Sequence, residues 1–159
     1  MKIEGKGVYT LILFLDKISE LNIGKLGLIE FQDGWYAYNG SAMNKGSSGL
    51  FRRIRRHLVK KKKCFWHIDY LVNSKASSIK GVIYANTEQR YECTISKKMK
   101  EHAQPVKRFG SSDCIEGCGG HLFYFGNNKT IFDKILRIYD TCTLEAVIKE
   151  NPTLATCLQ

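Results

Sequence analysis

Runs of apolar residues predict the strands of this chain. Residues 8–15 form a mainly apolar run rich in β-forming side chains, which is typical of a fully buried strand. After a polar turn at 16–22, spaced apolar residues predict a second, weaker strand over 23–31. Asp33-Gly34 is a strong hairpin signal, and a third strand is expected over 35–38. A hairpin or three-stranded meander therefore begins the chain, and later strands are predicted at 78–84 and 121–125.

Helical spacing begins after a loop rich in Gly, Ser and Asn at 39–48. Leu50, Ile54 and Leu58 share one face of a predicted helix whose other faces carry arginines. Ser47 or Ser48 is the expected N-cap of this helix. Further helices are predicted over 66–72, over 87–103 with Thr87 as cap, over 130–139, and in a short tail segment from 143. The chain has neither an internal repeat nor a long linker, so we expect one domain.

Composition excludes several classes of protein. The chain has 159 residues, 43% hydrophobic and 25% charged, which fits one globular domain with a core of its own. The run at 8–15 is far shorter than the roughly 20 apolar residues that a membrane-spanning helix needs. It also lacks the small-residue cleavage site of a signal peptide. We therefore expect a cytoplasmic protein that does not bind membranes.

The excess of positive charge is confined to one segment. The formal net charge is +10, from 25 basic and 15 acidic residues. Between Asp33 and Asp69 there is no acidic residue, and nine basic ones lie there, among them Arg52, Arg53 and the run at 60–63. A concentrated positive field is suited to a polyanion such as nucleic acid. A solvated helix face followed by a lysine-rich loop is the alternative interpretation.

Three short motifs carry candidate chemistry. Gly7-Val8-Tyr9 begins the first predicted strand, and Tyr38-Asn39-Gly40 ends the third. Arg53 and His57 are four residues apart on the basic helix, so they share one face and can reach a single ligand. Arginine offers planar donors to a phosphate, and histidine can hold or transfer a proton. Strand ends that meet this helix would bring two phenols beside a phosphate.

These motifs resemble those of the GIY-YIG nuclease superfamily. Gly7-Val8-Tyr9 is a conservative variant of the first motif, and in Tyr38-Asn39-Gly40 an asparagine replaces the usual aliphatic residue. The Arg-x-x-x-His step of Arg53 and His57 also matches. A closer resemblance, to an uncharacterised and mainly archaeal branch, is carried by residues 36–42, 53–58, 66–70 and 109–125.

The resemblance implies a fold and an activity. It implies an α/β fold with a small antiparallel sheet flanked by helices: a nuclease-like domain over 1–126, and a helical C-terminal extension over 127–159 packed on the same domain. It implies a metal-dependent endonuclease that hydrolyses phosphodiester bonds with one Mg²⁺ or Mn²⁺ ion. DNA or another structured nucleic acid is the expected substrate, with DNA favoured over RNA.

The resemblance also assigns roles to individual residues. Tyr9 would activate or orient the attacking water beside Tyr38, and Arg53 would neutralise charge on the phosphoryl oxygens. His57 and His67 would orient water or phosphate. The metal ligand maps best to Glu92, with Glu88 as the competing assignment. The residues expected to bind the nucleic-acid backbone are Ser41, Arg52, Arg56, Lys60, Lys61, Lys62 and Lys63.

Two other functions fit the same residues. The altered second motif and the competing glutamates are compatible with a nucleic-acid-binding module that has lost cleavage, since a fold does not fix a function. A structural protein of a ribonucleoprotein would need only the basic helix and the lysine run. Taken singly, Tyr9 and Tyr38 are ordinary strand aromatics, and Glu92 is one of several acidic neighbours. The distance of Glu92 from the two tyrosines therefore decides whether a catalytic site can exist.

The cysteines suggest a second site. Without a signal peptide, the six cysteines are expected to be reduced thiols rather than a disulfide framework. Cys114, Cys118 and His121 lie within eight residues of one another, and two thiolates with an imidazole suit tetrahedral zinc. Cys93 is the candidate fourth ligand. The spacing matches no established zinc signature, so free cysteines in a glycine-rich loop, or an anion-binding loop at 110–112, are the competing interpretations.

Overall fold

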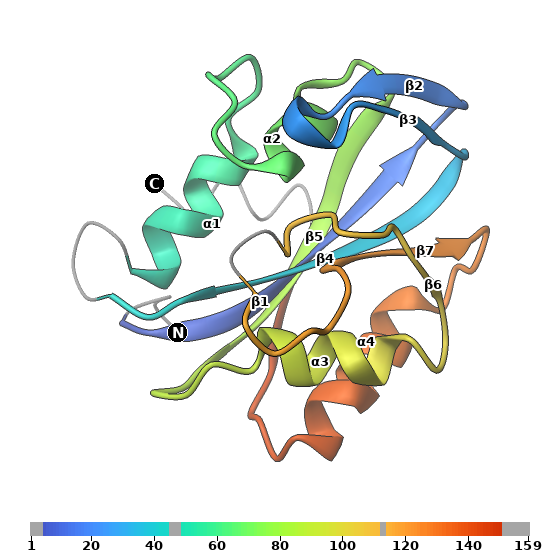
Figure 1. The fold of residues 1–159 in the computed structure, drawn as a ribbon. Coiled ribbons are helices and arrows are strands. Elements are labelled where there is room, and N and C mark those ends of the chain that lie inside the picture. Colours follow the sequence, from blue (N-terminus) through green and yellow to red (C-terminus); the bar gives the residue numbers. More distant parts are fainter. Residues whose placement is uncertain (1–4, 45–48, 112–113, 151–159) are drawn as a thin grey trace.

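Strand β1 (Gly7–Leu15) lies at the centre of the sheet, because it pairs antiparallel with β4 (Gly34–Ala42) and β5 (Ser77–Asn86) along its whole length. This is a computed structural model, and it describes residues 5–44, 49–111 and 114–150. The six strands are antiparallel, in the order β6-β7-β4-β1-β5-β8 (Figure 1). The remaining members are β6 (Gln104–Pro105), β7 (Leu122–Gly126) and β8 (Val147–Glu150).

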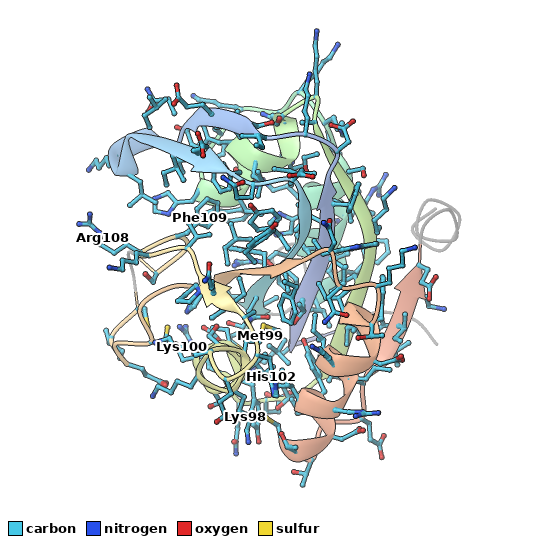
Figure 2. All side chains as sticks on the ribbon, turned by 90° about the vertical axis from the view of Figure 1, so that its right-hand side faces the viewer. Lys98, Met99, Lys100, His102, Arg108 and Phe109 are labelled. Carbon is cyan, nitrogen blue, oxygen red and sulfur yellow. The ribbon has the colours of Figure 1, made fainter. Side chains whose placement is uncertain are left out.

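Helices cover both faces of this sheet (Figure 1). On one face, α1 (Leu50–Leu58) and α2 (His67–Asn73) pack on the alternate β1 side chains that include Tyr9 and Leu11. On the other face, α3 (Glu92–Met99) and α4 (Ile131–Thr141) pack on Val8 and Ile12. The period-2 alternation of β1 therefore divides the apolar residues into two cores. Along α3, Met99 is buried against the sheet, whereas Lys100 is exposed (Figure 2).

The predicted fold class is confirmed. The chain is α/β, with an antiparallel sheet flanked by helices. The predicted strands at 8–15, 78–84 and 121–125 correspond to β1, β5 and β7, and the predicted helices at 66–72 and 130–139 correspond to α2 and α4. The predicted basic helix corresponds to α1, which ends at Leu58 rather than in the lysine run at 60–63. Within the described residues, none of these helices combines the length and apolar character needed to span a bilayer.

The predicted pairing at 16–38 is wrong. The segment expected to be a turn contains β2 (Ser19–Asn22), which pairs with β3 (Leu28–Phe31) as a separate hairpin around the 3₁₀ turn η1 (Gly24–Leu26). Asp33-Gly34 therefore does not join β3 to β4 in a hairpin. Both edges of β4 are already occupied, by β1 and β7. Gly34 has a φ of 126°, which suits the abrupt entry into β4.

Two predicted helices also need correction. The helix expected over 87–103 is restricted to α3, because residues 87–91 leave β5 through a turn in which the Gln89 N–H donates to Thr87 Oγ1. The short helix expected after 143 is wrong, since β8 pairs with β5 and covers its outer edge. The predicted caps Ser47 and Ser48 lie outside the described residues, and Gly49 is the N-cap of α1.

Candidate active site and metal-binding cluster

A pocket lies where β4 extends beyond its partner β7. Strand β7 pairs with β4 only from Trp35 to Tyr38, so the outer edge of the following residues is not covered by a strand. The pocket has a volume of about 360 Å³. Tyr9 of β1, Tyr38 of β4, Arg53 of α1 and Glu92 of α3 all line it. Four elements that are distant in the sequence therefore contribute the principal predicted residues to one cavity.

Tyr9 and His57 form a buried hydrogen-bonded pair. The Tyr9 hydroxyl lies 2.8 Å from His57 Nε2, and both side chains are almost fully buried. Burial lowers the pKa of His57 to about 3, although the Asp69 carboxylate opposes this shift. Burial, followed by the neighbouring Tyr38, raises the pKa of Tyr9. Tyr9 is therefore a neutral phenol that shares a hydrogen bond with a neutral imidazole, and in either direction of that bond its oxygen keeps a lone pair able to accept a hydrogen bond from the pocket.

Two glycines allow the tyrosines to lie this close to the backbone. A Cβ on Gly40 would collide with the Tyr9 hydroxyl. A Cβ on Gly110 would lie 2.9 Å from Tyr38 Cε2, and Gly110 has a φ of 73°, a conformation that favours glycine. Gly40 is therefore required because the Tyr9 ring lies against its Cα, and not only because a glycine suits a turn.

Glu92 is the first residue of α3, and it lines the pocket. Its Oε2 is buried and has no hydrogen-bond partner among the described residues. The competing residue Glu88 pairs instead with Lys6 at 2.8 Å, and its side chain is 75% exposed. A buried carboxylate oxygen without a donor is costly unless a cation or a proton compensates it. Of the two glutamates, Glu92 is thus the one suited to hold a metal ion.

A buried polar network that the sequence did not reveal fixes α3 on the sheet. Asn39, fully buried on β4, accepts a hydrogen bond from Thr10 at 2.7 Å and donates to Ser96 Oγ of α3 at 3.0 Å. The Thr10 hydroxyl also contacts the Tyr139 hydroxyl of α4 at 3.0 Å. The asparagine in the second motif therefore ties β4 to the helix that begins with Glu92. An isolated polar residue in an apolar strand is the only sequence signal of such a network.

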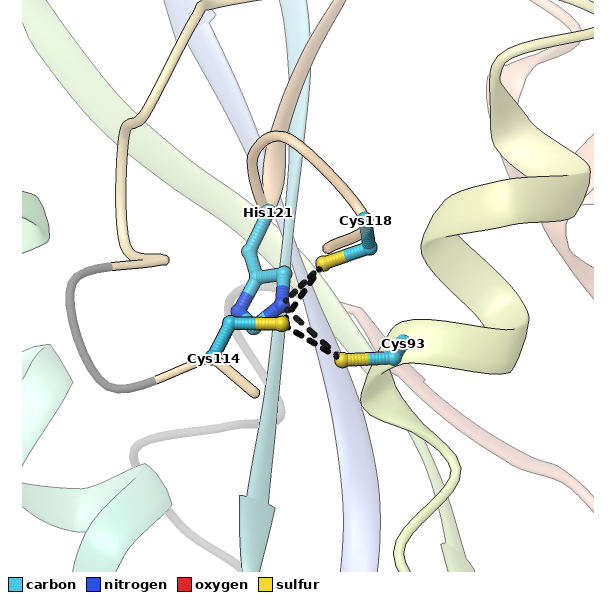
Figure 3. A group of neighbouring side chains, drawn as sticks. All are labelled: Cys93, Cys114, Cys118 and His121. Carbon is cyan, nitrogen blue, oxygen red and sulfur yellow. Dashed lines mark hydrogen bonds between the residues drawn. The ribbon is translucent and has the colours of Figure 1, made fainter. Parts of the chain in front are cut away.

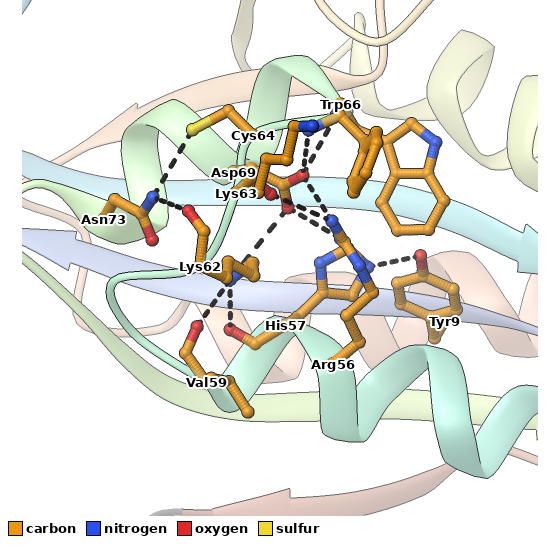
Figure 4. Close-up of polar contacts among 11 residues, drawn as sticks. Tyr9, Arg56, His57, Val59, Lys62, Lys63, Cys64, Trp66, Asp69 and Asn73 are labelled. Atoms are coloured by element: carbon orange, nitrogen blue, oxygen red, sulfur yellow. Dashed lines mark hydrogen bonds and ion pairs between the residues drawn. The ribbon is translucent and has the colours of Figure 1, made fainter.

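A second polar network organises the basic segment (Figure 4). Asp69 is fully buried and accepts two bonds from Arg56, at 2.9 and 2.8 Å. Burial opposes ionisation of Asp69, but the Arg56 guanidinium and two backbone N–H donors outweigh it and lower the pKa of this carboxyl. Lys62 donates to the Val59 carbonyl at 2.7 Å, and Lys60 to the Ser77 carbonyl at 2.7 Å. Arg56, Lys60 and Lys62, which the sequence assigned to nucleic-acid binding, therefore bond within the protein.

The remaining predicted residues lie in three kinds of position. Ser41 lines the pocket, and Arg53 lies there with its Cζ 5.0 Å from the centre of the Trp66 ring. Arg52, Lys61 and Lys63 are exposed. His67 is not among the residues that line the pocket; its Nδ1 accepts the Gly110 N–H at 2.9 Å and its ring packs on Phe109. His67 thus holds the loop that packs against Tyr38, and it bonds to Gly110, which lines the cavity, without lining the cavity itself.

Three cysteines and a histidine converge at the wall of the pocket, which Cys93, Cys114 and His121 also line (Figure 3). The Sγ atoms of Cys93, Cys114 and Cys118 and a ring nitrogen of His121 all lie within 4.8 Å of one another. His121 Nε2 is 3.0 Å from Cys118 Sγ and 3.6 Å from Cys93 Sγ. The expected fourth ligand, Cys93, is brought in by α3. These residues could hold a metal ion.

The thiols of this cluster influence one another. Burial raises the pKa of Cys93, and hydrogen bonds with the neighbouring thiols raise it further. Burial tends to raise the pKa of Cys114 as well. Hydrogen bonds from the Cys118 backbone and from the Cys93 thiol outweigh this effect and lower the pKa of Cys114 to about 7. Burial lowers the pKa of His121, which keeps its imidazole neutral. A thiol that ionises readily and a neutral imidazole are the forms in which cysteine and histidine bind metals.

Comparison with known proteins gives one match. No curated protein and no solved structure matches the chain. A family model described as a domain of unknown function, DUF123, matches residues 8–144, a range that includes every pocket residue named above and all four residues of the cysteine cluster. The match covers most of the chain, and the protein therefore belongs to the DUF123 family.

Proposed function

We propose that this protein is a metal-dependent endonuclease that hydrolyses phosphodiester bonds in the pocket between β4 and α3. The observation that carries the proposal is the presence of Tyr9, Tyr38, Arg53 and Glu92 in one cavity. The resemblance of their motifs to the GIY-YIG nucleases supports the same assignment. DNA is the preferred substrate in this proposal. The five described free cysteines are consistent with the reducing cytoplasm, where we place the activity.

The proposed mechanism gives each residue a role that suits its surroundings. The Tyr9 hydroxyl shares a hydrogen bond with His57, and its oxygen can accept a hydrogen bond from the attacking water and so orient that water. Its raised pKa argues against a tyrosinate that acts as a strong base. Arg53 neutralises the charge that develops on the phosphoryl oxygens. Tyr38 completes the wall of the pocket beside Tyr9.

Glu92 is the proposed ligand of one Mg²⁺ or Mn²⁺ ion. These hard cations prefer oxygen ligands and are often held by one or two carboxylates together with substrate phosphates. A buried carboxylate oxygen that has no hydrogen-bond partner among the described residues, in a residue that lines the pocket, fits that pattern. When bound, such an ion supplies Lewis-acid stabilisation of the leaving oxygen.

Cleavage assays on matched glutamate variants test this function. The protein is incubated with single-stranded, nicked and branched DNA and with RNA, in Mg²⁺ or Mn²⁺. We expect Glu92→Gln and Tyr9→Phe to lower the cleavage rate by roughly 10²- to 10³-fold, as the loss of one transition-state contact does. Glu88→Gln, an exposed residue outside the pocket, serves as the control and should keep the rate. Cleavage that survives in both variants would overturn the proposal, and binding without any cleavage would identify the non-catalytic module instead.

For the cysteine cluster, the proposed metal is zinc. Three cysteines with one histidine are a common ligand set of structural zinc sites, and such sites need no open coordination position. Zinc here would join α3, which begins with Glu92, to the loop that precedes β7. It is a second metal site, separate from the carboxylate site of Glu92.

Metal analysis tests the zinc assignment independently of activity. Protein purified without added metal should contain about one zinc per chain by mass spectrometry. Cys118→Ser and His121→Ala should lose the metal, whereas Cys64→Ser, a free cysteine outside the cluster, should retain it. Zinc that is well below stoichiometric in the unmodified protein, or that persists in the cluster variants, would contradict the assignment.

A further inference from the structure

Two neighbouring aromatic side chains are exposed at the rim of the pocket. Phe65 and Trp66 precede α2 and are 71% and 37% exposed. Trp66 lines the pocket together with Arg53, so this aromatic pair is continuous with the cavity. Adjacent exposed large aromatic rings are unusual on a protein surface unless they contact a partner. Their position beside a candidate phosphate site raises the question of what they bind.

Polar contacts hold the two aromatic residues in place. The Asp69 carboxylate accepts the backbone N–H groups of Phe65 and Trp66, at 2.9 and 3.0 Å. The same carboxylate fixes Arg56, whose guanidinium lies 4.1 Å from the Trp66 ring centre and 5.6 Å from that of Phe65 (Figure 4). The backbone that carries the rings is thus anchored to a buried ion pair, and little conformational entropy is lost when a ligand stacks on them.

Cations surround the two rings. Lys63 Nζ lies 5.6 Å from the centre of the Phe65 ring, and Arg53 Cζ lies 5.0 Å from that of Trp66. The surface therefore combines π-faces with positive charge. This combination is complementary to a nucleotide, which has an aromatic base and an anionic phosphate, and less so to an apolar peptide, which would leave the charges unpaired.

We propose that Phe65, flanked by Trp66 and the arginines that lie over the Trp66 ring, forms a stacking platform for an unpaired base next to the phosphate in the pocket. The proposal rests on the nuclease function above and names its substrate class: a single strand, or a strand with an unpaired segment at the cleavage site. In a duplex the faces of the bases are covered by their neighbours, so an exposed ring cannot stack on them without unpairing. The platform should therefore favour unpaired nucleic acid.

Binding measurements separate this proposal from the activity itself. The full-length Glu92→Gln protein, which is expected to cut roughly 10²- to 10³-fold more slowly, is titrated with a labelled oligothymidylate of about 15 nucleotides and with a hairpin duplex of similar charge, by fluorescence anisotropy. We expect Phe65→Ala in this background to weaken single-strand binding by roughly 10- to 100-fold, as the loss of one stacking ring does. Duplex binding should change by less than about twofold, because no base can reach the ring.

Two variants complete the experiment. Phe65→Tyr keeps an aromatic face and should retain the affinity for the single strand. Leu28→Ala removes a similarly exposed apolar side chain from the β2–β3 hairpin and should leave the affinity for both probes unchanged. Equal weakening of both probes by Phe65→Ala, or no weakening, would overturn the platform while leaving the nuclease function intact. Self-association that Phe65→Ala abolishes would identify a protein interface instead. Failure of every nucleic acid to bind would overturn both proposals.

Discussion

At the scale of single residues, burial determines the chemistry of the pocket. His57 is fully buried and shares a hydrogen bond with Tyr9, and burial lowers its pKa to about 3. An unfolded chain would have an ordinary histidine pKa of 6.5 at this position. Below that pH this histidine binds a proton in the unfolded state, whereas the buried imidazole of the folded state stays neutral. Acidification therefore favours unfolding through this residue.

The first prediction follows from this difference. Below about pH 5.5, where the histidine of the unfolded chain is mostly protonated, His57 makes the free energy of unfolding fall by about 1.4 kcal/mol for each unit of pH, and at pH 6.5 the slope is about half of that. His57→Gln should remove this dependence of the free energy of unfolding on pH. It should also lower stability at neutral pH, because it disturbs the hydrogen bond between His57 and Tyr9. Urea unfolding at several pH values measures the free energy of unfolding and hence its dependence on pH. His102→Gln, at an exposed position on the turn after α3, is the control and should leave the slope unchanged. An unchanged slope in His57→Gln would show that His57 is not held neutral.

The sequence predicted the identity of the pocket residues better than their surroundings. Tyr9, Tyr38 and Arg53 could be selected because strand ends and helical spacing are local patterns. The burial of His57, and the capture of Arg56 by Asp69, could not be predicted, because each depends on a partner that only the folded chain brings near. The charge of a residue in the sequence does not reveal whether it is available to a ligand.

At the scale of secondary-structure elements, the placement of α3 decides whether Glu92 reaches the pocket. The amide of Asn39 links β4 to Ser96 of this helix and also contacts Met99 Sδ at 3.3 Å. The cysteine cluster adds a second link through Cys93. Both links connect α3 to the β4 side of the sheet, where the pocket lies.

The second prediction concerns this attachment. Asn39→Leu should lower the free energy of unfolding by about 2 kcal/mol, because it leaves the buried Ser96 hydroxyl without its donor. It should also speed amide exchange in α3 more than in α1. Denaturant unfolding and exchange mass spectrometry measure the two effects. Asn22→Leu, at an exposed position on β2, should stay within about 0.5 kcal/mol of the parent protein. Equal exchange in both helices would mean that Asn39 does not anchor α3.

Elements were predictable where their signals are local. The amphipathic helix α1 and the apolar strand β1 match their predictions closely. The β2–β3 hairpin and β8 were missed because a short strand is defined by its partner, and β8 finds its partner β5 more than sixty residues earlier in the sequence. The pairing of β4 with β1 likewise overrode the local hairpin signal at Asp33-Gly34.

At the scale of the whole molecule, the position of the charge matters more than its total. The net charge is +10, and the basic segment forms α1 and the loop that follows it, on one face of the sheet. Arg52 and Arg55 of α1 are exposed, whereas Arg56, Lys60 and Lys62 bond to other parts of the protein. The number of charges available to a nucleic acid is therefore smaller than the sequence suggests.

The third prediction tests this distribution. If exposed arginines of α1 contact phosphates, Arg52→Ala should reduce the slope of log affinity against log salt concentration by about 0.9 on duplex DNA. Arg137→Ala removes an equally exposed arginine from α4, on the opposite face, and should not change the slope. Affinity that does not depend on salt at all would exclude an electrostatic interface.

The central position of β1 has a consequence for how the pocket behaves over time. Because β1 is hydrogen-bonded on both sides along its length, its amides should exchange with solvent only when the whole sheet opens. Tyr9 therefore keeps its place as long as the molecule is folded. Arg53 lies on α1 and Cys114 on the loop before β7, both outside the sheet, and amides in such segments generally exchange through smaller openings than those of a central strand. Hydrogen exchange should therefore separate the part of the pocket that persists until global unfolding, carried by β1, from the part carried by segments outside the sheet.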